Sequence, residues 1–200
     1  MVVRKGERTR GAILDGAWRL ATELGLEGLT LGRLAEDLEL SKSGLFAHFG
    51  SKDELQTATL ARAAERFAEI VILPALQSTG GEQRLRALVE RWLDWPRRAR
   101  QPGGCIFVAA AAELDDRPGP ARDKLVALQR EWRDTLARVV KRAQDLGDLR
   151  PDVDPGQLAF EIQGIGLACH ETARLLRDPR AVERARAAFE RLLADARARS

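Results

Sequence analysis

The stretch Leu29–Leu55, LTLGRLAEDLELSKSGLFAHFGSKDEL, decides the fold of this chain. Thr30 stands where its hydroxyl can cap a short helix whose apolar residues recur at helical spacing. A tight turn follows, and Ser41 is placed to cap a second short helix. Ser51 with Glu54 three residues later is typical of a capping box, which predicts the start of a third, longer helix. Two short helices on a tight turn, followed at once by another helix, predict a helix-turn-helix.

The second short helix combines an apolar side with a slim polar side, as a helix that enters the major groove of DNA requires. The residues that we expect closest to DNA are Lys42, Ser43, Gly44 and His48. The residues that we expect to hold phosphates from the flanking helices are Thr30, Gly32, Arg33 and Lys52. The alternative is an ordinary bundle of three helices in which these polar side chains are only solvated.

The same stretch resembles the DNA-binding domain of the tetracycline-repressor (TetR) family of bacterial transcription regulators. The residues that carry the resemblance are Gly25, Thr30, Leu34-Ala35, Ser41-Lys42, Leu45-Phe46, His48-Phe49 and Ser51-Lys52-Asp53-Glu54-Leu55. The family usually has a tyrosine where this chain has Phe46, and the chain contains no tyrosine. A phosphate contact through that hydroxyl is therefore absent, and we expect Phe46 to pack or to touch the DNA backbone through its ring edge.

The composition indicates a globular, helical protein whose positive charge is local. The chain has 200 residues, of which 44% are hydrophobic and 32% charged, and its formal net charge is +3. That length suits one or two domains, and the small net charge excludes a broadly basic coat for nucleic acid. Basic residues gather near the N-terminus, at Arg4, Lys5, Arg8 and Arg10. This arm either approaches DNA beside the helix-turn-helix or is a solvated tail.

The rest of the chain has helical periodicity and no strand pattern, so we expect an all-α protein of about nine helices. A first helix from about Thr9 to Leu24, closed by Gly25, supports the helix-turn-helix. A long helix from Ser51 toward Pro74 connects it to the remainder. We therefore expect an N-terminal three-helix DNA-binding domain at 1–51 and a helical effector-binding and dimerisation domain at 52–200.

The last two predicted helices, about 154–176 and 178–197, are candidates for a dimer interface. The first is apolar around much of its circumference, so it must be covered on more than one side. The resemblance implies a four-helix bundle formed by these helices from two chains; the alternative is that they pack only on their own body. The residues that we expect at the interface are Leu158, Ile162, Ile165, Cys169, Phe189 and Leu192.

The resemblance also implies a small-molecule pocket in the C-terminal body. The candidate lining residues are Trp92, Trp95, Phe107, Trp132, Leu136, Phe160 and His170. Each of these has a competing interpretation as plain core, because an aromatic residue at helical spacing more often fills the interior. Tryptophan is of interest because its buried N–H seeks a hydrogen-bond partner, which a polar ligand can supply.

The sequence contains no catalytic triad, phosphate-binding loop or metal-ligand spacing, so we expect neither an enzyme nor a cofactor. Cys105 follows two glycines at a predicted helix start, where a thiol pKa falls; it is either a redox switch or a small core residue. The N-terminus is charged, and no stretch approaches the roughly 20 apolar residues of a membrane span. We therefore expect a cytoplasmic protein without a membrane partner.

Together these expectations describe a homodimeric transcription repressor that a small molecule releases from DNA. Its two recognition helices would lie about 34–36 Å apart on a palindromic operator in double-stranded DNA. Two alternatives remain open. One is a regulator that senses oxidation through Cys105 or binds a protein partner, and the other is a helical enzyme or interaction module with a coincidental N-terminal pattern.

Overall fold

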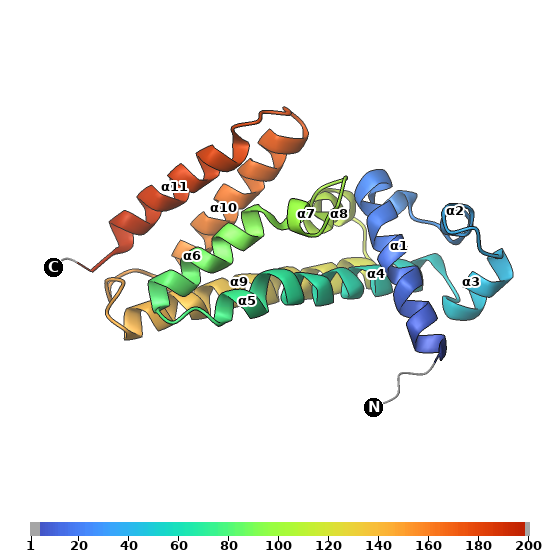
Figure 1. The fold of residues 1–200 in the computed structure, drawn as a ribbon, viewed down its shortest axis with the longest axis horizontal. Helices are drawn as coiled ribbons and strands as arrows, with labels where there is room; N and C mark the ends of the chain where they lie inside the picture. Colours follow the sequence, from blue (N-terminus) through green and yellow to red (C-terminus); the bar gives the residue numbers. More distant parts are fainter. Residues whose placement is uncertain (1–4, 199–200) are drawn as a thin grey trace. The chain divides into compact units, whose positions relative to one another are not determined.

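The computed structural model describes residues 5–198, with side chains from Thr9 onward, and every repeating element in that range is helical. The helices are α1 (Lys5–Gly28), α2 (Leu31–Asp37), α3 (Lys42–His48), α4 (Lys52–Phe67), α5 (Leu73–Leu76), α6 (Gly81–Leu93), α7 (Trp95–Arg98), α8 (Ile106–Leu114), α9 (Pro120–Asp145), α10 (Pro155–Arg174) and α11 (Ala181–Ala196) (Figure 1). A π-helical turn, η1 (Ala68–Ile72), joins α4 to α5. The predicted all-α fold is confirmed, although the sequence pattern did not separate the one-turn helices α5 and α7.

The chain forms two compact units that do not follow its sequence order. The first unit holds the described residues as far as Arg66 together with Arg100–Leu128. The second unit holds Phe67–Ala99 and the described residues from Gln129 onward. The division that the sequence suggests, after residue 51, stays a prediction.

The core of the first unit forms where α1 meets the helix-turn-helix. The buried residues of α1 recur at helical spacing and face the buried residues of the following helices. Residues with no more than 4% of their surface exposed include Ala17, Leu20, Ala21, Leu34, Leu45, Phe49 and Leu55. Gly25, with φ of 79°, interrupts α1 where the sequence predicted its end, and a last turn continues to Gly28. Only a residue without a Cβ adopts this conformation readily.

The loop before α8 lies directly on the backbone of α1. The N–H of Gly103 donates to Thr22 Oγ1 at 3.2 Å, and the Thr22 hydroxyl donates in turn to the carbonyl of Arg19 at 2.8 Å. A Cβ atom added to Gly103 would stand 1.4 Å from the carbonyl oxygen of Thr22. The approach is therefore possible only with glycine at this position.

A carboxylate from α8 holds the last turn of α1. The two oxygens of Glu113 accept hydrogen bonds from the backbone N–H groups of Leu26 at 3.1 Å and Glu27 at 2.7 Å. These two N–H groups follow the break at Gly25 and would otherwise lack a helical acceptor. Residues 103 and 113 together fix the C-terminal half of α1.

The second unit is built around an aromatic cluster and the pair α10 and α11. The ring centroids of Phe67 and Trp132 lie 5.0 Å apart, those of Phe67 and Trp95 5.2 Å, and those of Trp92 and Trp132 5.1 Å. Gly166 of α10 makes room for this cluster, because a Cβ there would stand 2.0 Å from the Trp92 ring. Helices α10 and α11 lie side by side and run in opposite directions (Figure 1). No helix within the described residues is long and apolar enough to cross a membrane.

Candidate nucleic-acid interface

Both short helices of the helix-turn-helix have the side-chain caps that the sequence predicts. The Thr30 hydroxyl accepts a hydrogen bond from the N–H of Arg33 at 3.1 Å, which begins α2. The Ser41 hydroxyl accepts from the N–H of Gly44 at 3.1 Å, which begins α3. In the turn between them Glu39 adopts a φ of 53°, a left-handed conformation that lets the chain reverse within a few residues.

Helix α3 is held from inside and leaves its polar side free. Leu45 within the helix and Phe49 after it are fully buried and anchor it to the core of the first unit. The exposed residues of α3 include three of the predicted DNA contacts, namely Lys42, Ser43 and Gly44. The fourth, His48, is half-buried beside the ring of Phe49. A narrow exposed turn that carries hydroxyl and ammonium donors matches what the major groove requires.

The predicted contact residues of α2 lie at the start of that helix, close to the exposed first turn of α3. Thr30 and Arg33 are exposed at the start of α2. The Lys42 side chain lies over Gly32, where an added Cβ would be 3.8 Å from Lys42 Cε. This is an ordinary van der Waals distance, so the Lys42 side chain lies against Gly32 without requiring glycine at that position.

Phe46 does not pack into the protein. It is 56% exposed, so the expectation that it packs is wrong, and a contact of its ring with DNA stays a prediction. The alternation of buried Leu45 with exposed Phe46 follows from the rotation of about 100° between neighbouring residues of a helix.

The basic N-terminal arm is described only in part. Arg4 lies outside the described residues, as do the side chains of Lys5 and Arg8. The guanidinium of Arg10 lies over the ring of Phe49, 5.0 Å from its centroid. This cation–π contact attaches the first part of α1 to the end of α3.

The start of α4 has the Ser51 cap that the sequence predicts, while the return bond of Glu54 goes to Gly50, one residue before the N-cap. The Ser51 hydroxyl accepts from the N–H of Glu54 at 3.1 Å, and the Glu54 carboxylate accepts from the N–H of Gly50 at 3.2 Å. This exchange orders the junction between α3 and α4 and fixes Lys52 in the first turn of α4.

Lys52 is ion-paired in this structure. Its Nζ lies 3.2 Å from Oε2 of Glu27, and a guanidinium nitrogen of Arg117 lies 3.3 Å from the same oxygen. The hydrogen bond from Lys52 holds the pKa of the Glu27 carboxyl below its ordinary value, and both cations add to this effect. This cluster could not be predicted from the sequence, because Arg117 is distant along the chain from both Glu27 and Lys52.

A second ionic cluster holds α1 on α4. Both oxygens of the Asp15 carboxylate accept hydrogen bonds from Arg62, at 2.7 and 2.9 Å, and Arg66 donates to the same group at 3.0 Å. Partial burial acts to raise the pKa of Asp15, but the hydrogen bonds from Arg62 and Arg66 hold it below its ordinary value. This bidentate geometry fixes the direction of α1 relative to the last two turns of α4, which carry Arg62 and Arg66.

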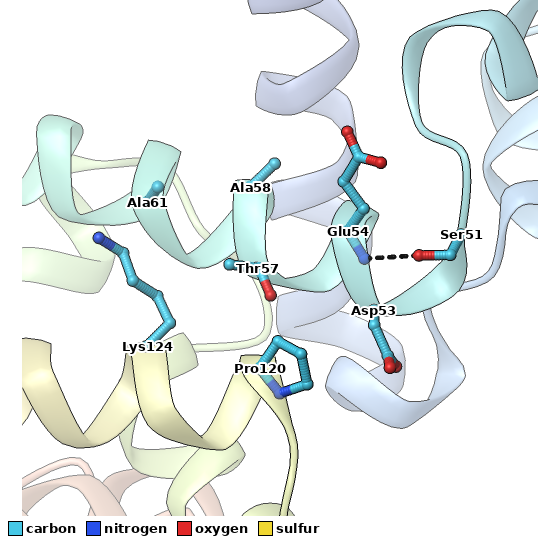
Figure 2. A pocket seen from close by; sticks show the side chains of 8 residues that line it. All are labelled: Ser51, Asp53, Glu54, Thr57, Ala58, Ala61, Pro120 and Lys124. Carbon is cyan, nitrogen blue, oxygen red and sulfur yellow. Dashed lines mark hydrogen bonds between the residues drawn. The ribbon is translucent and has the colours of Figure 1, made fainter.

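An open hollow of about 580 Å³ lies between the first turns of α4 and α9. Figure 2 shows the α4 side chains along one wall and Pro120 and Lys124 of α9 along the other. The Oγ1 atom of Thr57, on the α4 wall, is buried and has no hydrogen-bond partner among the described residues. None of the residues that line this hollow was among the ligand-binding candidates from the sequence.

The predicted ligand-binding residues fall in several different places. Trp92, Trp95 and Trp132 meet in the aromatic cluster of the second unit, where Leu136 is also fully buried. Nε1 of Trp132 is buried there, and no described residue supplies it with a hydrogen-bond partner. The others lie apart from this group and are Phe107 in the first unit, Phe160, which is 63% exposed, and His170, which is half-buried. Burial lowers the pKa of the His170 imidazole, and the neighbouring charge of Arg174 adds to the shift.

Four of the six predicted dimer-interface residues are buried within the chain itself, and their place at an interface stays a prediction. Residues buried inside the second unit are Leu158, Ile162, Cys169 and Phe189, while Ile165 and Leu192 are half-buried. The buried four already pack within their own protomer and offer little surface to a second chain. The outward face of α10 carries instead exposed residues at helical spacing, namely Phe160, Gly164, Leu167 and Ala168. Leu175 and Leu176, just beyond its end, are 73% and 66% exposed.

The cysteines occupy interior positions. Cys105 is at the N-cap of α8, as expected, but only 6% of its surface is exposed. Cys169 is also buried, and its burial raises the pKa of the thiol. A buried thiol is accessible to oxidants only through local opening, so these positions favour the core interpretation. Within the described part of the chain, no group of histidine, cysteine or acidic side chains is arranged to hold a metal ion.

Two family models match the chain. The model of bacterial regulatory proteins of the tetR family matches residues 13–59, and that of the tetracyclin repressor-like C-terminal domain matches residues 81–189. Together they cover both the helix-turn-helix and most of the remaining helices.

Curated relatives include transcriptional repressors. The chain is 31% identical to the HTH-type transcriptional repressor AcnR of Corynebacterium diphtheriae, over 72% of this chain and 70% of that protein. It is 42% identical to AcnR of Corynebacterium glutamicum over 34% of this chain, a match that spans only 36% of that relative.

Solved structures share the fold. A TetR transcriptional regulator from Chloroflexus aurantiacus is 27% identical with a TM-score of 0.85, over 96% of both chains. AibR, solved in complex with isovaleryl coenzyme A and operator DNA, is 28% identical with a TM-score of 0.67, over 81% of this chain and 86% of that one.

Proposed function

Because the chain belongs to the TetR family of bacterial regulatory proteins, we propose that it is a homodimeric transcriptional repressor released from operator DNA by a small molecule. The observation that carries the proposal is the geometry of α3. This helix is capped by Ser41, anchored by buried Leu45 and exposed along Lys42–Gly44. As a regulator of chromosomal genes, it would act in the cytoplasm.

The proposed contacts with DNA divide into two groups. Lys42, Ser43, Gly44 and His48 enter the major groove, and the ring of Phe46 touches the sugar-phosphate backbone. Thr30, Gly32, Arg33 and Lys52 hold phosphates on either side of the groove and set the register of the helix. The exposure of Lys42, Ser43 and Gly44 and the caps of α2 and α3 support this arrangement.

Lys42→Ala and Lys52→Ala are each expected to weaken DNA binding by roughly 10-fold or more without changing the fold, because each removes a cation from the interface in both protomers. The measurement is the dissociation constant for a duplex that the wild-type protein selects from a random-sequence pool, at fixed salt. Lys141→Ala is the matched control, because Lys141 pairs with Asp145 on α9 in the second unit. Wild-type affinity in both Lys42→Ala and Lys52→Ala would contradict the proposed interface.

The dimer is proposed to form through the outward face of α10 together with α11. Phe160, Leu167 and Leu175 present apolar surface there, and Gly164 and Ala168 permit another helix to approach closely. A two-fold protein suits a palindromic operator, because each half-site then meets an identical head.

The effector is proposed to bind in the C-terminal part of the chain. It would shift the dimer toward a conformation in which the distance between the two recognition helices no longer matches successive major grooves of the operator. Nε1 of Trp132 is buried and lacks a partner in the described part of the chain, which supports a polar ligand in the aromatic cluster. A thermal-shift screen of small metabolites tests this, because a ligand of the folded state raises the melting temperature. A true effector must both raise the melting temperature and release the protein from DNA. If the aromatic cluster is the site, Trp132→Phe must weaken binding of that effector.

A further inference from the structure

Two cations from separate segments meet a single carboxylate oxygen beside the helix-turn-helix. Lys52 Nζ from the first turn of α4 lies 3.2 Å from Glu27 Oε2. A guanidinium nitrogen of Arg117, from the loop between α8 and α9, lies 3.3 Å from the same oxygen. This arrangement of an ammonium and a guanidinium around one anionic oxygen is the one in which proteins hold a phosphate oxygen.

The cluster is both fixed in place and open to solvent. Glu113 accepts the backbone N–H of Glu27 at 2.7 Å, and the N–H of Arg117 donates to the carbonyl of Leu114 at 3.2 Å. These contacts fix the backbones that carry the carboxylate and the guanidinium. The side chains themselves remain accessible, with Lys52 40%, Glu27 45% and Arg117 61% exposed. A large anionic partner can therefore reach them without unfolding any helix.

The cluster also lies where DNA is proposed to bind. Glu27 precedes Thr30, the N-cap of α2, by three residues, and Lys52 is itself a proposed phosphate contact. A carboxylate at such a position repels the phosphate backbone, so its presence there calls for an explanation beyond surface solvation.

We propose that Lys52 and Arg117 form a phosphate-binding site for operator DNA, which the carboxylate of Glu27 occupies in the free protein as an internal substitute for the phosphate. Arg117 extends the DNA interface beyond the helix-turn-helix into the segment that follows α8. Glu27 holds the two cations together and competes with DNA for them. This inference rests on the proposed function, because it assumes that DNA approaches the start of α2 and α4.

The test compares single variants on the duplex selected by the wild-type protein. Arg117→Gln is expected to weaken DNA binding about 5- to 10-fold. It should also reduce the slope of log K against log salt concentration by about 0.9 for each DNA-binding domain of the dimer, as loss of one phosphate contact requires. Glu27→Gln is expected to tighten binding about 5- to 10-fold, because it removes the competing charge. In the Glu27→Gln background, Arg117→Gln should still reduce the salt slope by the same amount.

Arg122→Gln is the matched control, because it removes one positive charge from the start of α9, where Arg122 Nε donates to the carbonyl of Asp115. It should leave the salt slope unchanged. Equal slopes for Arg117→Gln and wild type would overturn the phosphate site. A lower melting temperature with no gain in affinity for Glu27→Gln would show that its ion pairs are purely structural and overturn the competition. Failure of the wild-type protein to bind any duplex would instead remove the proposed function itself.

Discussion

Gly103→Ala is expected to destabilise the protein by more than about 3 kcal/mol, the largest stability effect anticipated for a single methyl group in this chain. The added Cβ would lie 1.4 Å from the carbonyl oxygen of Thr22 and 1.8 Å from its carbonyl carbon. Both are backbone atoms of α1, which cannot rotate away as a side chain can. Relief requires the loop to leave α1, and that movement breaks the hydrogen bond from Gly103 to Thr22.

The measurement is thermal unfolding followed by circular dichroism, in which a loss of this size lowers the melting temperature by roughly 6–12 °C for a chain of this length. Gly11→Ala is the matched control, since an added Cβ at Gly11 of α1 meets no atom of the described residues within 4 Å. That change is expected to stabilise α1 by about 0.5–1 kcal/mol. If Gly103→Ala melts like the wild type, the loop is not seated on α1.

Ala168→Glu is expected to separate the dimer and to reduce operator affinity by about 100-fold or more, since two linked heads bind far more tightly than one. Ala168 is exposed on the outward face of α10, in line with Gly164 and Phe160. A carboxylate there would be buried without a partner when two copies meet, which an apolar interface does not tolerate.

The molar mass in solution, measured by light scattering, and the dissociation constant for DNA together check this result. Ala127→Glu introduces the same charge at an exposed position of α9 and should remain a dimer with wild-type affinity. A dimeric Ala168→Glu protein with unchanged affinity would place the interface on another face.

The local features of the fold could be predicted because they depend on neighbours in the sequence. The caps of α2, α3 and α4 by Thr30, Ser41 and Ser51 each involve residues three apart. The contact between Gly103 and Thr22 joins residues 81 positions apart. No periodicity or propensity contains that information, since it arises only when α1 and the loop before α8 pack together.

The inward face of α10 likewise could not be predicted from the sequence, because it depends on contacts with distant helices. The sequence indicated correctly that this helix is apolar on more than one side, but it could not assign each side to its partner. The bulky stripe of Leu158, Ile162 and Cys169 is buried in the second unit, and Gly166 faces the ring of Trp92. The outward face carries both large and small residues, namely Phe160, Gly164, Leu167 and Ala168. Which stripe turned inward depended on packing against α6 and α11, and not on hydrophobicity alone.

The hold of residues 103 and 113 on α1 has a consequence for building chimaeric regulators. Both residues belong to the segment that matches the C-terminal family model, yet they bind α1, the helix on which the helix-turn-helix packs. A graft of the first 51 residues onto another body would leave the amides of Leu26 and Glu27 without the Glu113 carboxylate. A chimaera that is meant to keep the DNA specificity of this chain must therefore include residues 100–117 together with the first 51 residues.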